Sequence, residues 1–591
     1  MNNLFHFFFS FFLLTLPLQV TARHEKSLSS KPNPLFFKHN QMILDLDFMT
    51  NIFQISYGPA AWKNERFGWD LSTEILKSKK LIADDPSLSQ KEFQRIVKEF
   101  CFRTKDYHVI PQFYSTEGSS LPFQIQGIQG KYFVSEVFPE EDHSLTEFPL
   151  SVGDELLAIN GKPVSEVLEK FRKKEIGENH LETDKALAEL YFTSRLGSSG
   201  HEIPKGSIEI RFCKKNENRA QKCTLEWNYH SQKISQAPMP YPDRSLGKPS
   251  AILKKNPYKK QFTTPHCALL KKKFVENNEP SDMLGSRKSR IPPLGMVLWE
   301  SDPQSEFHAY LFLMDDMHVG GYVRIPSYNV DGDYAADEFA ELIEVFQEVS
   351  DVLVIDQVNN GGGLVLYLYA LVAMLTDYEL KVPMHQVMLT QEEVYFAYNS
   401  SRILESVTNN RSARKILGDT LEGITVDYNL VTSLLNSHQF VINQWNSGKL
   451  FTDFHHLYGI EKISPHPEVN YKKPILILTN SLDFSAADFF PAIMQDNGRA
   501  KIMGSRTAGA GGYVEKIFFP NLNGVEELDV TASFAVRSNG MPIENYGVTP
   551  DIPYEITEVD IKNNYCDYKE NILIELKKMC NSSDTPPSSG L

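Results

Sequence analysis

Residues 474–490 read PILILTNSLDFSAADFF, an apolar strand, a polar turn and then a helix rich in Ala and Phe. The run PILILT has the composition of a buried strand. The serines that follow have an ordinary structural explanation, since Ser481 or Ser485 can cap the helix. They also have a chemical one, because a serine held at the end of a strand can act as a nucleophile. Other parts of the chain have to distinguish the two.

A second turn of this kind lies at residues 356–363, DQVNNGGG. It follows the buried-strand pattern DVLVIDQV and precedes the run LVLYLYALVAMLT, which predicts a helix. Consecutive glycines adopt backbone conformations that are closed to other residues, and they let N–H groups approach a ligand closely. Glycine N–H groups beside a serine hydroxyl would supply the donors and the nucleophile of acyl transfer. Taken alone, the glycines also fit a simple turn.

Strands and helices alternate from residue 296 to 556, which predicts an α/β fold with a parallel component. A helical stretch is expected within it at 391–446. A chain of 591 residues should form two to four domains. Upstream, residues 23–118 have helical periodicity with a turn at DDPS, and residues 119–230 have the pattern of short strands. Residues 557–591 are expected to form a C-terminal helix and tail.

Residues 151–171, SVGDELLAINGKPVSEVLEKF, combine a Gly-Asp turn, a strand, an Asn-Gly hairpin turn and an amphipathic helix. This succession resembles the signature of PDZ domains, in which the hairpin precedes the helix that borders the peptide groove. The resemblance implies a PDZ-like domain over residues 119–230, a kind of domain that binds extended peptides by adding them as a strand. The groove loop is not recognisable in the sequence, so peptide binding stays open.

The composition excludes some classes of protein. A formal charge of −15 argues against a general nucleic-acid binder, which would carry a broad basic face. Six cysteines in so long a chain do not make a disulfide scaffold, and the bridge between Cys213 and Cys223 stays open. No cofactor is predicted. His455 and His456 are a weak candidate metal pair, but no HExxH or CxxC framework supports a metal site.

The N-terminus predicts export. Residues Leu4 to Leu18 form an apolar block of fifteen, which is short for a membrane span. Small residues ending at Ala22 fit a cleavage site, although no Lys or Arg precedes the block. We therefore expect residues 1–22 to be a cleaved signal peptide rather than a retained anchor. The mature protein should be secreted, with no further attachment to a membrane.

Residues 231–295 differ in composition from the rest of the chain. Between Arg244 and Arg290 there are twelve Lys or Arg and three Asp or Glu, a local charge of +9. Prolines recur, and the periodicity is poor. These residues form either a solvated linker or a segment that docks on an acidic surface of its own protein.

Four motifs in sequence order, GYVRIPSY, LVIDQVNNGGG, LTNSLDFSAADFF and GSRTAGAGGYV, resemble those of the C-terminal-processing (tail-specific) peptidases, serine peptidase family S41. The resemblance covers about residues 120 to 555, the PDZ-like domain included. It implies a crotonase/ClpP-like α/β catalytic core at 296–556, with Ser485 and not Ser481 as the nucleophile. It also implies an oxyanion hole made by the backbone N–H groups of Ala486 and Gly362.

One departure from that family concerns the base. The tail-specific enzymes carry a lysine 25 residues after the serine, but position 510 is Ala here, and Lys501 and Lys516 lie in other turns. An alkoxide does not form readily at neutral pH without a base. His108, in RTKDYHVIPQF, is a candidate for that role, although its local sequence fits a buried structural histidine equally well.

The His108 region resembles that of the chlamydial protease-like activity factors, an S41-type group that uses Ser, His and Glu. The glutamate motif of that group is similar to PIENYGVTPDI, which gives Glu544. The resemblance therefore implies a triad of Ser485, His108 and Glu544. It further implies a homodimer, host-cell proteins as substrates, and a zymogen activated by self-cleavage, with the basic segment in the place of an inhibitory insert.

The resulting hypothesis is a secreted serine endopeptidase. An unperturbed histidine base would make its activity decline below roughly pH 6 to 7. Two other functions remain possible on the sequence: a catalytically inactive PDZ-bearing adaptor, and a crotonase-type acyl-CoA enzyme, whose fold also builds oxyanion holes from glycines at strand ends.

Overall fold

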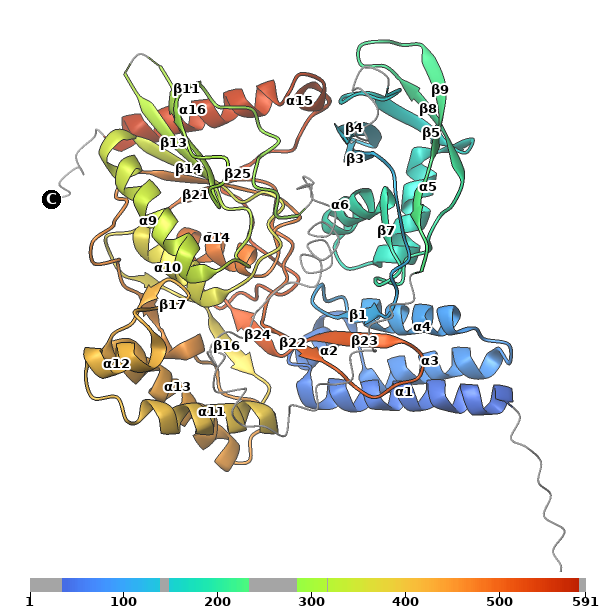
Figure 1. Ribbon diagram of the computed structural model, residues 1–591, viewed down its shortest axis with the longest axis horizontal. Coiled ribbons are helices and arrows are strands. Elements are labelled where there is room, and N and C mark those ends of the chain that lie inside the picture. The colour runs from blue at the N-terminus through green and yellow to red at the C-terminus, as the bar shows by residue number, and fades with distance from the viewer. Residues whose placement is uncertain (1–33, 139–147, 233–283, 316, 584–591) are drawn as a thin grey trace, which may run out of the picture.

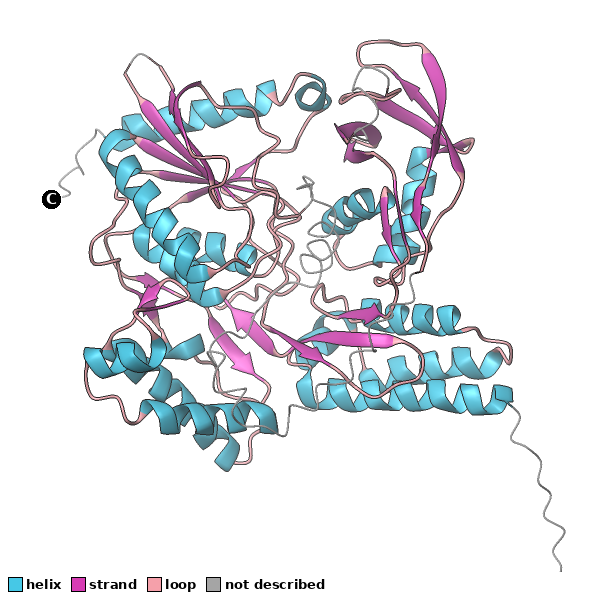
Figure 2. Ribbon diagram, in the orientation of Figure 1, coloured by secondary structure: helices cyan, strands magenta, loops and turns pink. Residues whose placement is uncertain are grey.

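The computed structural model describes residues 34–138, 148–232, 284–315 and 317–583 (Figure 1). The predicted signal peptide and most of the basic segment lie outside these residues. The described chain contains a helical N-terminal region, a PDZ-like part and an α/β part (Figure 2), which confirms the predicted fold class. Within it, no helix combines the length and apolar character that a bilayer span requires.

The N-terminal region consists of four helices: α1 (Pro34–Ser56), α2 (Ala60–Phe67), α3 (Leu71–Asp84) and α4 (Gln90–Arg103). The DDPS turn separates α3 from α4. Ser89 caps α4, because its hydroxyl accepts from the backbone N–H of Glu92 while the Glu92 carboxylate accepts from the backbone N–H of Ser89. Aromatic side chains of α1 and α4 form the core of this region, together with Leu528 and Val530 from far along the chain.

The PDZ-like part is built on a sheet in the order β3 (Phe123–Ile128), β4 (Lys131–Val137), β5 (Glu155–Ile159), β8 (Ser207–Cys213) and β9 (Ala220–Glu226). The predicted Asn-Gly turn joins β5 to β6 (Lys162–Pro163), and Asn160 and Gly161 both have positive φ, as a type I′ turn requires. Two helices follow, α5 (Val164–Phe171) and α6 (Leu181–Phe192). The helix that packs along the edge strand β3 is α6 and not α5. Cys213 and Cys223 lie on neighbouring strands, where both are free thiols.

A seven-stranded sheet forms the centre of the α/β part. Its order is β11 (Met296–Glu300), β12 (His308–Leu313), β13 (Val319–Arg324), β14 (Val352–Asp356), β20 (Ile475–Thr479), β21 (Lys501–Gly504) and β25 (Ile552–Pro553). Pairing is parallel from β13 to β25. Both β14 and β20 are buried on two faces, which explains why their sequences are continuously apolar.

Helices cover both faces of this sheet (Figure 1). Leu353 and Ile355 pack with α9 (Gly332–Val349), α10 (Val365–Met374) and α14 (Ala486–Asp496). Val352 and Val354 point to the other face, where α16 (Cys566–Ser583) lies. The alternation follows from the two-residue period of a strand. The expected helical stretch contains α11 (Gln391–Leu404), α12 (Asn410–Leu417) and α13 (Tyr428–Asn446).

The N-terminal region and the α/β part share a three-stranded sheet, seen low in the centre of Figure 1. Strand β1 (Ile110–Phe113) pairs antiparallel with β23 (Val525–Thr531), and β23 pairs with β22 (Val514–Ile517). His108 lies two residues before β1. This pairing therefore brings the predicted base into the part of the molecule that holds the predicted nucleophile.

The remaining elements are short. They are β2 (Gly118–Ser120), β7 (Ser194–Leu196), β10 (Asn228–His230), β15 (Leu380–Lys381), β16 (Met384–Val387), β17 (Thr420–Leu421), β18 (Ile424–Thr425), β19 (Lys462–Ile463), β24 (Ser533–Val536), α15 (Glu558–Lys562), the π-helical turn η1 (Arg172–Ile176) and the 3-10 turn η3 (Leu457–Gly459).

Candidate active site

The two polar turns singled out in the sequence meet in the structure. Strands β14 and β20 are parallel neighbours, so their carboxyl ends lie at the same edge of the sheet. The backbone N–H of Phe484 donates to the carbonyl of Asn360 at 2.9 Å, and the N–H of Asn360 donates to Asp483 Oδ1 at 3.1 Å. The glycine turn is thus bonded directly to the serine turn.

Ser485 stands at the N-terminus of α14 with φ of +57°, in the left-handed region that few non-glycine residues occupy. Its N–H donates to Asp488 Oδ2 at 2.9 Å, and the N–H of Asp488 donates back to the Ser485 carbonyl at 2.7 Å. A serine on a strained strand-to-helix turn is the arrangement by which several hydrolases present a nucleophile. Ser481, in contrast, lines a cavity of about 400 Å³ between the PDZ-like and α/β parts.

Both predicted oxyanion donors lie beside Ser485. A Cβ atom on Gly362, which has φ of +86°, would come within 2.8 Å of Ser485 Cβ and 3.0 Å of the Ala486 nitrogen. Only glycine fits this approach. The N–H of Ala486 has no acceptor within the described residues, whereas the N–H of Gly362 donates to Asn360 Oδ1 at 2.8 Å. The Ala486 N–H is therefore the donor that a substrate would find free.

His108 is fully buried. Neither of its ring nitrogens has a hydrogen-bond partner in the described part of the chain, Ser485 and Glu544 included. The ring of the preceding residue, Tyr107, packs edge-on against the ring of Phe484 at 5.6 Å, which places the two segments in contact. Burial lowers the pKa of His108 to about 4; Asp106 opposes this shift and Lys63 adds to it.

The loop that carries Ala510 is held at the site by Asp488. Its carboxylate accepts from the Thr507 hydroxyl and from the N–H groups of Gly509 and Ala510, at 2.8 Å and 2.9 Å. Burial raises the pKa of Asp488 to about 6. The position at which the tail-specific enzymes carry their lysine is thus adjacent to the serine turn, and in this chain a methyl group fills it.

Glu544 is also buried, and it is bonded to the same loop through the N–H of Gly511, which donates to Oε2 at 2.9 Å. Its Oε1 accepts from the ammonium of Lys63. Burial, with the charge of Asp106, raises the pKa of Glu544 to about 8, although the neighbouring Lys63 opposes the shift. The structure therefore brings Glu544 into the cluster around His108 without a direct hydrogen bond between the two side chains.

Lys63 is a member of the site that the sequence did not indicate. It lies in AAWKNERF, in α2, and its side chain is completely buried. Its carboxylate partner is 481 residues away. Nothing in the local sequence distinguishes Lys63 from the many exposed lysines of this chain. The motifs around Ser485 do not include it either.

The histidines considered as metal ligands have other contacts in the structure. The described chain holds no group of three or more His, Cys, Asp or Glu side chains able to bind an ion. His455 packs against the ring of Phe440 at 4.7 Å, and its Nδ1 lies 3.2 Å from the carbonyl of Asp453.

Comparisons with known proteins agree with this architecture. The pattern of the PDZ domain matches residues 117–234, and the pattern of peptidase family S41 matches residues 320–554. An uncharacterized protein of Chlamydia muridarum (strain MoPn / Nigg) is 35% identical over 562 residues, which cover 89% of this chain and 91% of that protein.

Two solved structures are similar along nearly the whole chain. Mature CPAF complexed with lactacystin is 32% identical with a TM-score of 0.79, and the match covers 92% of this chain and 100% of that one. A CPAF mutant in which a serine is replaced by alanine is 32% identical with a TM-score of 0.82, covering 93% and 99%.

Proposed function

The chain belongs to peptidase family S41 and is a serine peptidase of the group that contains CPAF, the chlamydial protease-like activity factor, and from this premise we propose that it is a secreted endopeptidase with a Ser485–His108–Glu544 triad. Ser485 attacks the scissile carbonyl, and His108 takes the serine proton and later delivers it to the leaving amine. Glu544 stabilises the imidazolium by its charge when it is ionised, a form that becomes the major one above its raised pKa of about 8. The N–H of Ala486, with Gly362 beside it, receives the oxyanion.

The observation that carries this proposal is the packing of Tyr107 on Phe484. These residues directly precede His108 and Ser485, so the segments that carry the histidine and the serine are in contact although the sequence separates them widely. His108 is buried with both ring nitrogens unbonded within the described chain. A buried structural histidine would normally have a partner, so the free nitrogens favour a base that awaits substrate.

Labelling of Ser485 by a fluorophosphonate tests the triad. The rate should follow the neutral form of His108, and since burial lowers the pKa of His108 to about 4, labelling should stay near its plateau down to about pH 5. An unperturbed histidine would instead give half the rate near pH 6.5, in line with its ordinary pKa of about 6.5.

Mass spectrometry should find the label on Ser485, and His108→Asn should lose labelling at every pH. Half-maximal labelling near pH 6.5 would show that His108 is solvated in the reactive enzyme and would contradict its buried role. An unlabelled wild type would favour the PDZ-bearing adaptor. The acyl-CoA alternative is set aside because the chain belongs to a peptidase family.

Export, dimerisation and activation form the second half of the proposal. The apolar N-terminus with its small-residue cleavage site supports a signal peptide at residues 1–22, and hence secretion. The similarity to a structure described as mature CPAF supports synthesis as a precursor. We propose that the chain acts as a homodimer and that host-cell proteins are its substrates. We also propose that the basic segment between Arg244 and Arg290, with its local charge of +9, inhibits the precursor.

The wild-type chain should cut itself roughly between Pro238 and Arg290, because proline-rich chain without helical or strand periodicity is accessible to proteases. Incubation of the purified protein should give two fragments that elute together. Ser485→Ala should remain a single chain under the same conditions and should be cut when mixed with wild type. A wild type that stays uncut while it is fully active would refute activation by self-cleavage.

A further inference from the structure

Asp106 is a buried carboxylate two residues before His108. Its Oδ1 accepts a hydrogen bond from the backbone N–H of His108 at 2.9 Å. Its Oδ2 accepts from the Tyr57 hydroxyl at 3.1 Å and from the Thr531 hydroxyl at 2.9 Å. All three partners donate to the carboxylate, and hydrogen bonds of this kind favour its charged form over its protonated form. Asp106 is therefore bound as an anion next to the predicted base.

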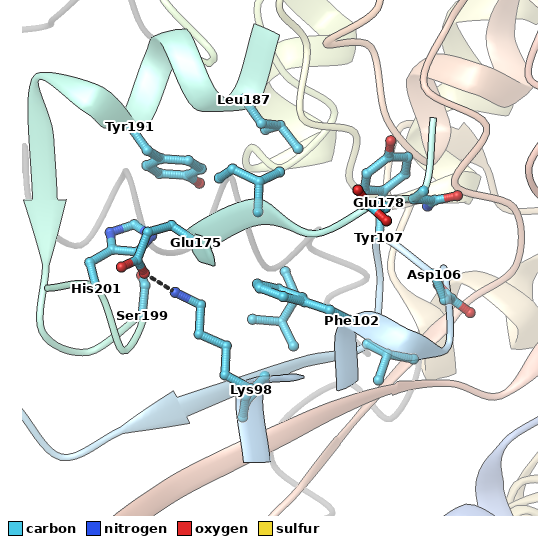
Figure 3. A pocket seen from close by; sticks show the side chains of 15 residues that line it. Lys98, Phe102, Asp106, Tyr107, Glu175, Glu178, Leu187, Tyr191, Ser199 and His201 are labelled. Atoms are coloured by element: carbon cyan, nitrogen blue, oxygen red, sulfur yellow. Dashed lines mark hydrogen bonds and ion pairs between the residues drawn. The ribbon is translucent and has the colours of Figure 1, made fainter. Parts of the chain in front are cut away.

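The carboxylate of Asp106 joins three elements of the fold. Tyr57 directly follows α1, Thr531 is the last residue of β23, and the histidine segment runs from α4 to β1. Asp106 also borders a small cavity of about 50 Å³, at the end that lies away from the ion pair of Lys98 and Glu175 (Figure 3). The lysine of this cavity is thus bonded to another carboxylate, and Asp106 is held by its three donors.

Two charges act on the buried ring of His108: Asp106 favours the imidazolium, and Lys63 on α2 opposes it. Glu544 is close to both groups, and burial together with the charge of Asp106 raises the pKa of Glu544 to about 8. Tyr57 is a neutral donor, because burial raises the pKa of its hydroxyl well above the ordinary value. Near neutral pH the protonated form of Glu544 predominates. The carboxylate that offsets Lys63 at the His108 ring is then Asp106.

We propose that Asp106 is a positioning residue of the active site, which stabilises the His108 imidazolium by its charge and holds the histidine segment through the backbone N–H of His108. It acts through His108, since its own side chain is buried. The role of Asp106 in the reaction rests on the triad proposed above. Its effect on the charge of the His108 ring does not depend on whether His108 is the base, so the two can be tested separately.

Asp106→Asn removes the charge and keeps the shape of the side chain. The amide oxygen can still accept from the His108 N–H, and the Tyr57 and Thr531 hydroxyls can turn from donors to acceptors. At pH 7 kcat/KM should fall by about 10- to 1,000-fold, because a neighbouring opposite charge changes a pKa by about 1 to 3 units and each unit is a tenfold change in the stability of the imidazolium. The loss should lie in kcat and not in KM, because the imidazolium forms only after the substrate has bound.

Nuclear magnetic resonance of ¹⁵N-labelled histidine rings measures the charge on His108 directly, and His108→Asn identifies its signal. The titration is made on enzyme labelled at Ser485 with a fluorophosphonate, because the bound phosphonyl oxygens favour the imidazolium and bring its titration to higher pH than in the free enzyme. Asp106→Asn should lower the pKa of His108 in this adduct by about 1 unit or more. In a variant that does not react with the label, the free ring is titrated near its pKa of about 4, where Asp106→Asn should carry less imidazolium than the wild type.

Tyr57→Phe and Thr531→Val are the controls for the hydrogen bonds. Each removes one donor to Asp106 and leaves the charge of Asp106 in place. Both variants should have a lower free energy of unfolding than the wild type and a pKa of His108 close to that of the wild type. Their loss of kcat/KM should be much smaller than that of Asp106→Asn. An equal loss in either control would show that Asp106 acts only by holding the structure, and would overturn the role of its charge.

Asp106→Glu keeps the carboxylate and should recover most of the decrease in the pKa of His108 that Asp106→Asn causes. If Asp106→Asn does not fold, Asp106→Ser takes its place, since its hydroxyl can still accept from the His108 N–H. An unchanged pKa of His108 in the uncharged variant would overturn this inference and leave the triad standing. A lowered pKa with an undiminished kcat/KM would overturn the role of His108 as the base and leave the electrostatic effect of Asp106 standing.

Discussion

Ser485→Ala should lower kcat/KM by about 10⁴-fold or more, the scale of losing a triad nucleophile. One hydroxyl is removed from a residue that is 7% exposed, and the backbone bonds between Ser485 and Asp488 remain. The fold should therefore be kept, apart from a small change due to the positive φ that alanine must also adopt. Hydrolysis of a fluorogenic peptide, with circular dichroism on the same samples, measures both quantities.

Ser481→Ala is the matched control, four residues earlier in the same turn. Ser481 lines the cavity between the PDZ-like and α/β parts, so its loss should change kcat/KM by only a small factor. An inactive Ser481→Ala variant together with an active Ser485→Ala variant would contradict the assignment of Ser485 as the nucleophile. The nucleophile would then lie at the cavity wall rather than at the start of α14.

Glu544→Gln should lower kcat/KM by roughly 10²- to 10⁴-fold, the range of a general acid–base group and its charged partner. The substitution keeps the shape of the side chain and removes the ionisable carboxyl beside Lys63. The pKa of this carboxyl is raised to about 8, so the negative charge is lost from the pH range in which Glu544 is ionised. The ammonium is then uncompensated close to His108, at which a second positive charge must form as Ser485 attacks. Leaving a buried charge without its counter-ion should also cost about 1 kcal/mol or more in unfolding free energy.

Glu175→Gln separates the two effects. This carboxylate is equally buried and also pairs with a lysine, at 2.7 Å, but it lies between the N-terminal region and the PDZ-like part. The Glu175→Gln variant should have a lower free energy of unfolding in urea than the wild type and keep most of the wild-type kcat/KM. A Glu544→Gln enzyme with more than about half the wild-type kcat/KM would have lost less than ~0.5 kcal/mol of transition-state stabilisation, too little for a triad member.

The α/β core was predictable because its local signals agree with one another. The strands around residues 352–356 and 475–479 are apolar throughout, since both faces of the sheet are covered, and polar turns follow each of them. The Asn160–Gly161 turn likewise specifies its hairpin through two positive φ values. The motif contains no information on which of the two successive helices, α5 or α6, packs along the edge strand β3, and in the structure this helix is α6.

The site was less accessible to sequence reasoning. The meeting of the serine and glycine turns follows from parallel neighbouring strands, which an α/β pattern implies. The complete burial of His108, which lowers its pKa, is not visible in the sequence. The ordinary pKa of histidine predicts a decline of activity below pH 6 to 7, whereas the lowered pKa predicts a decline well below pH 6. The presence of Lys63 in the site could not be predicted from the sequence, because it results from contacts with Glu544, Asn545 and Lys105 and not from a local motif.

The pairing of β1 with β23 determines what kind of catalyst a cut chain would be. A break in the proposed interval leaves His108 and Lys63 on one polypeptide, and Ser485 and Glu544 on the other. The antiparallel pairing from Ile110 to Phe113, and the helical core packed on Leu528 and Val530, would then join two separate polypeptides instead of two segments of one chain. The high effective concentration supplied by a continuous backbone would be gone. Recovery of activity after denaturation would become a bimolecular reaction that slows with dilution, whereas the uncut chain would regain its site at a rate independent of concentration.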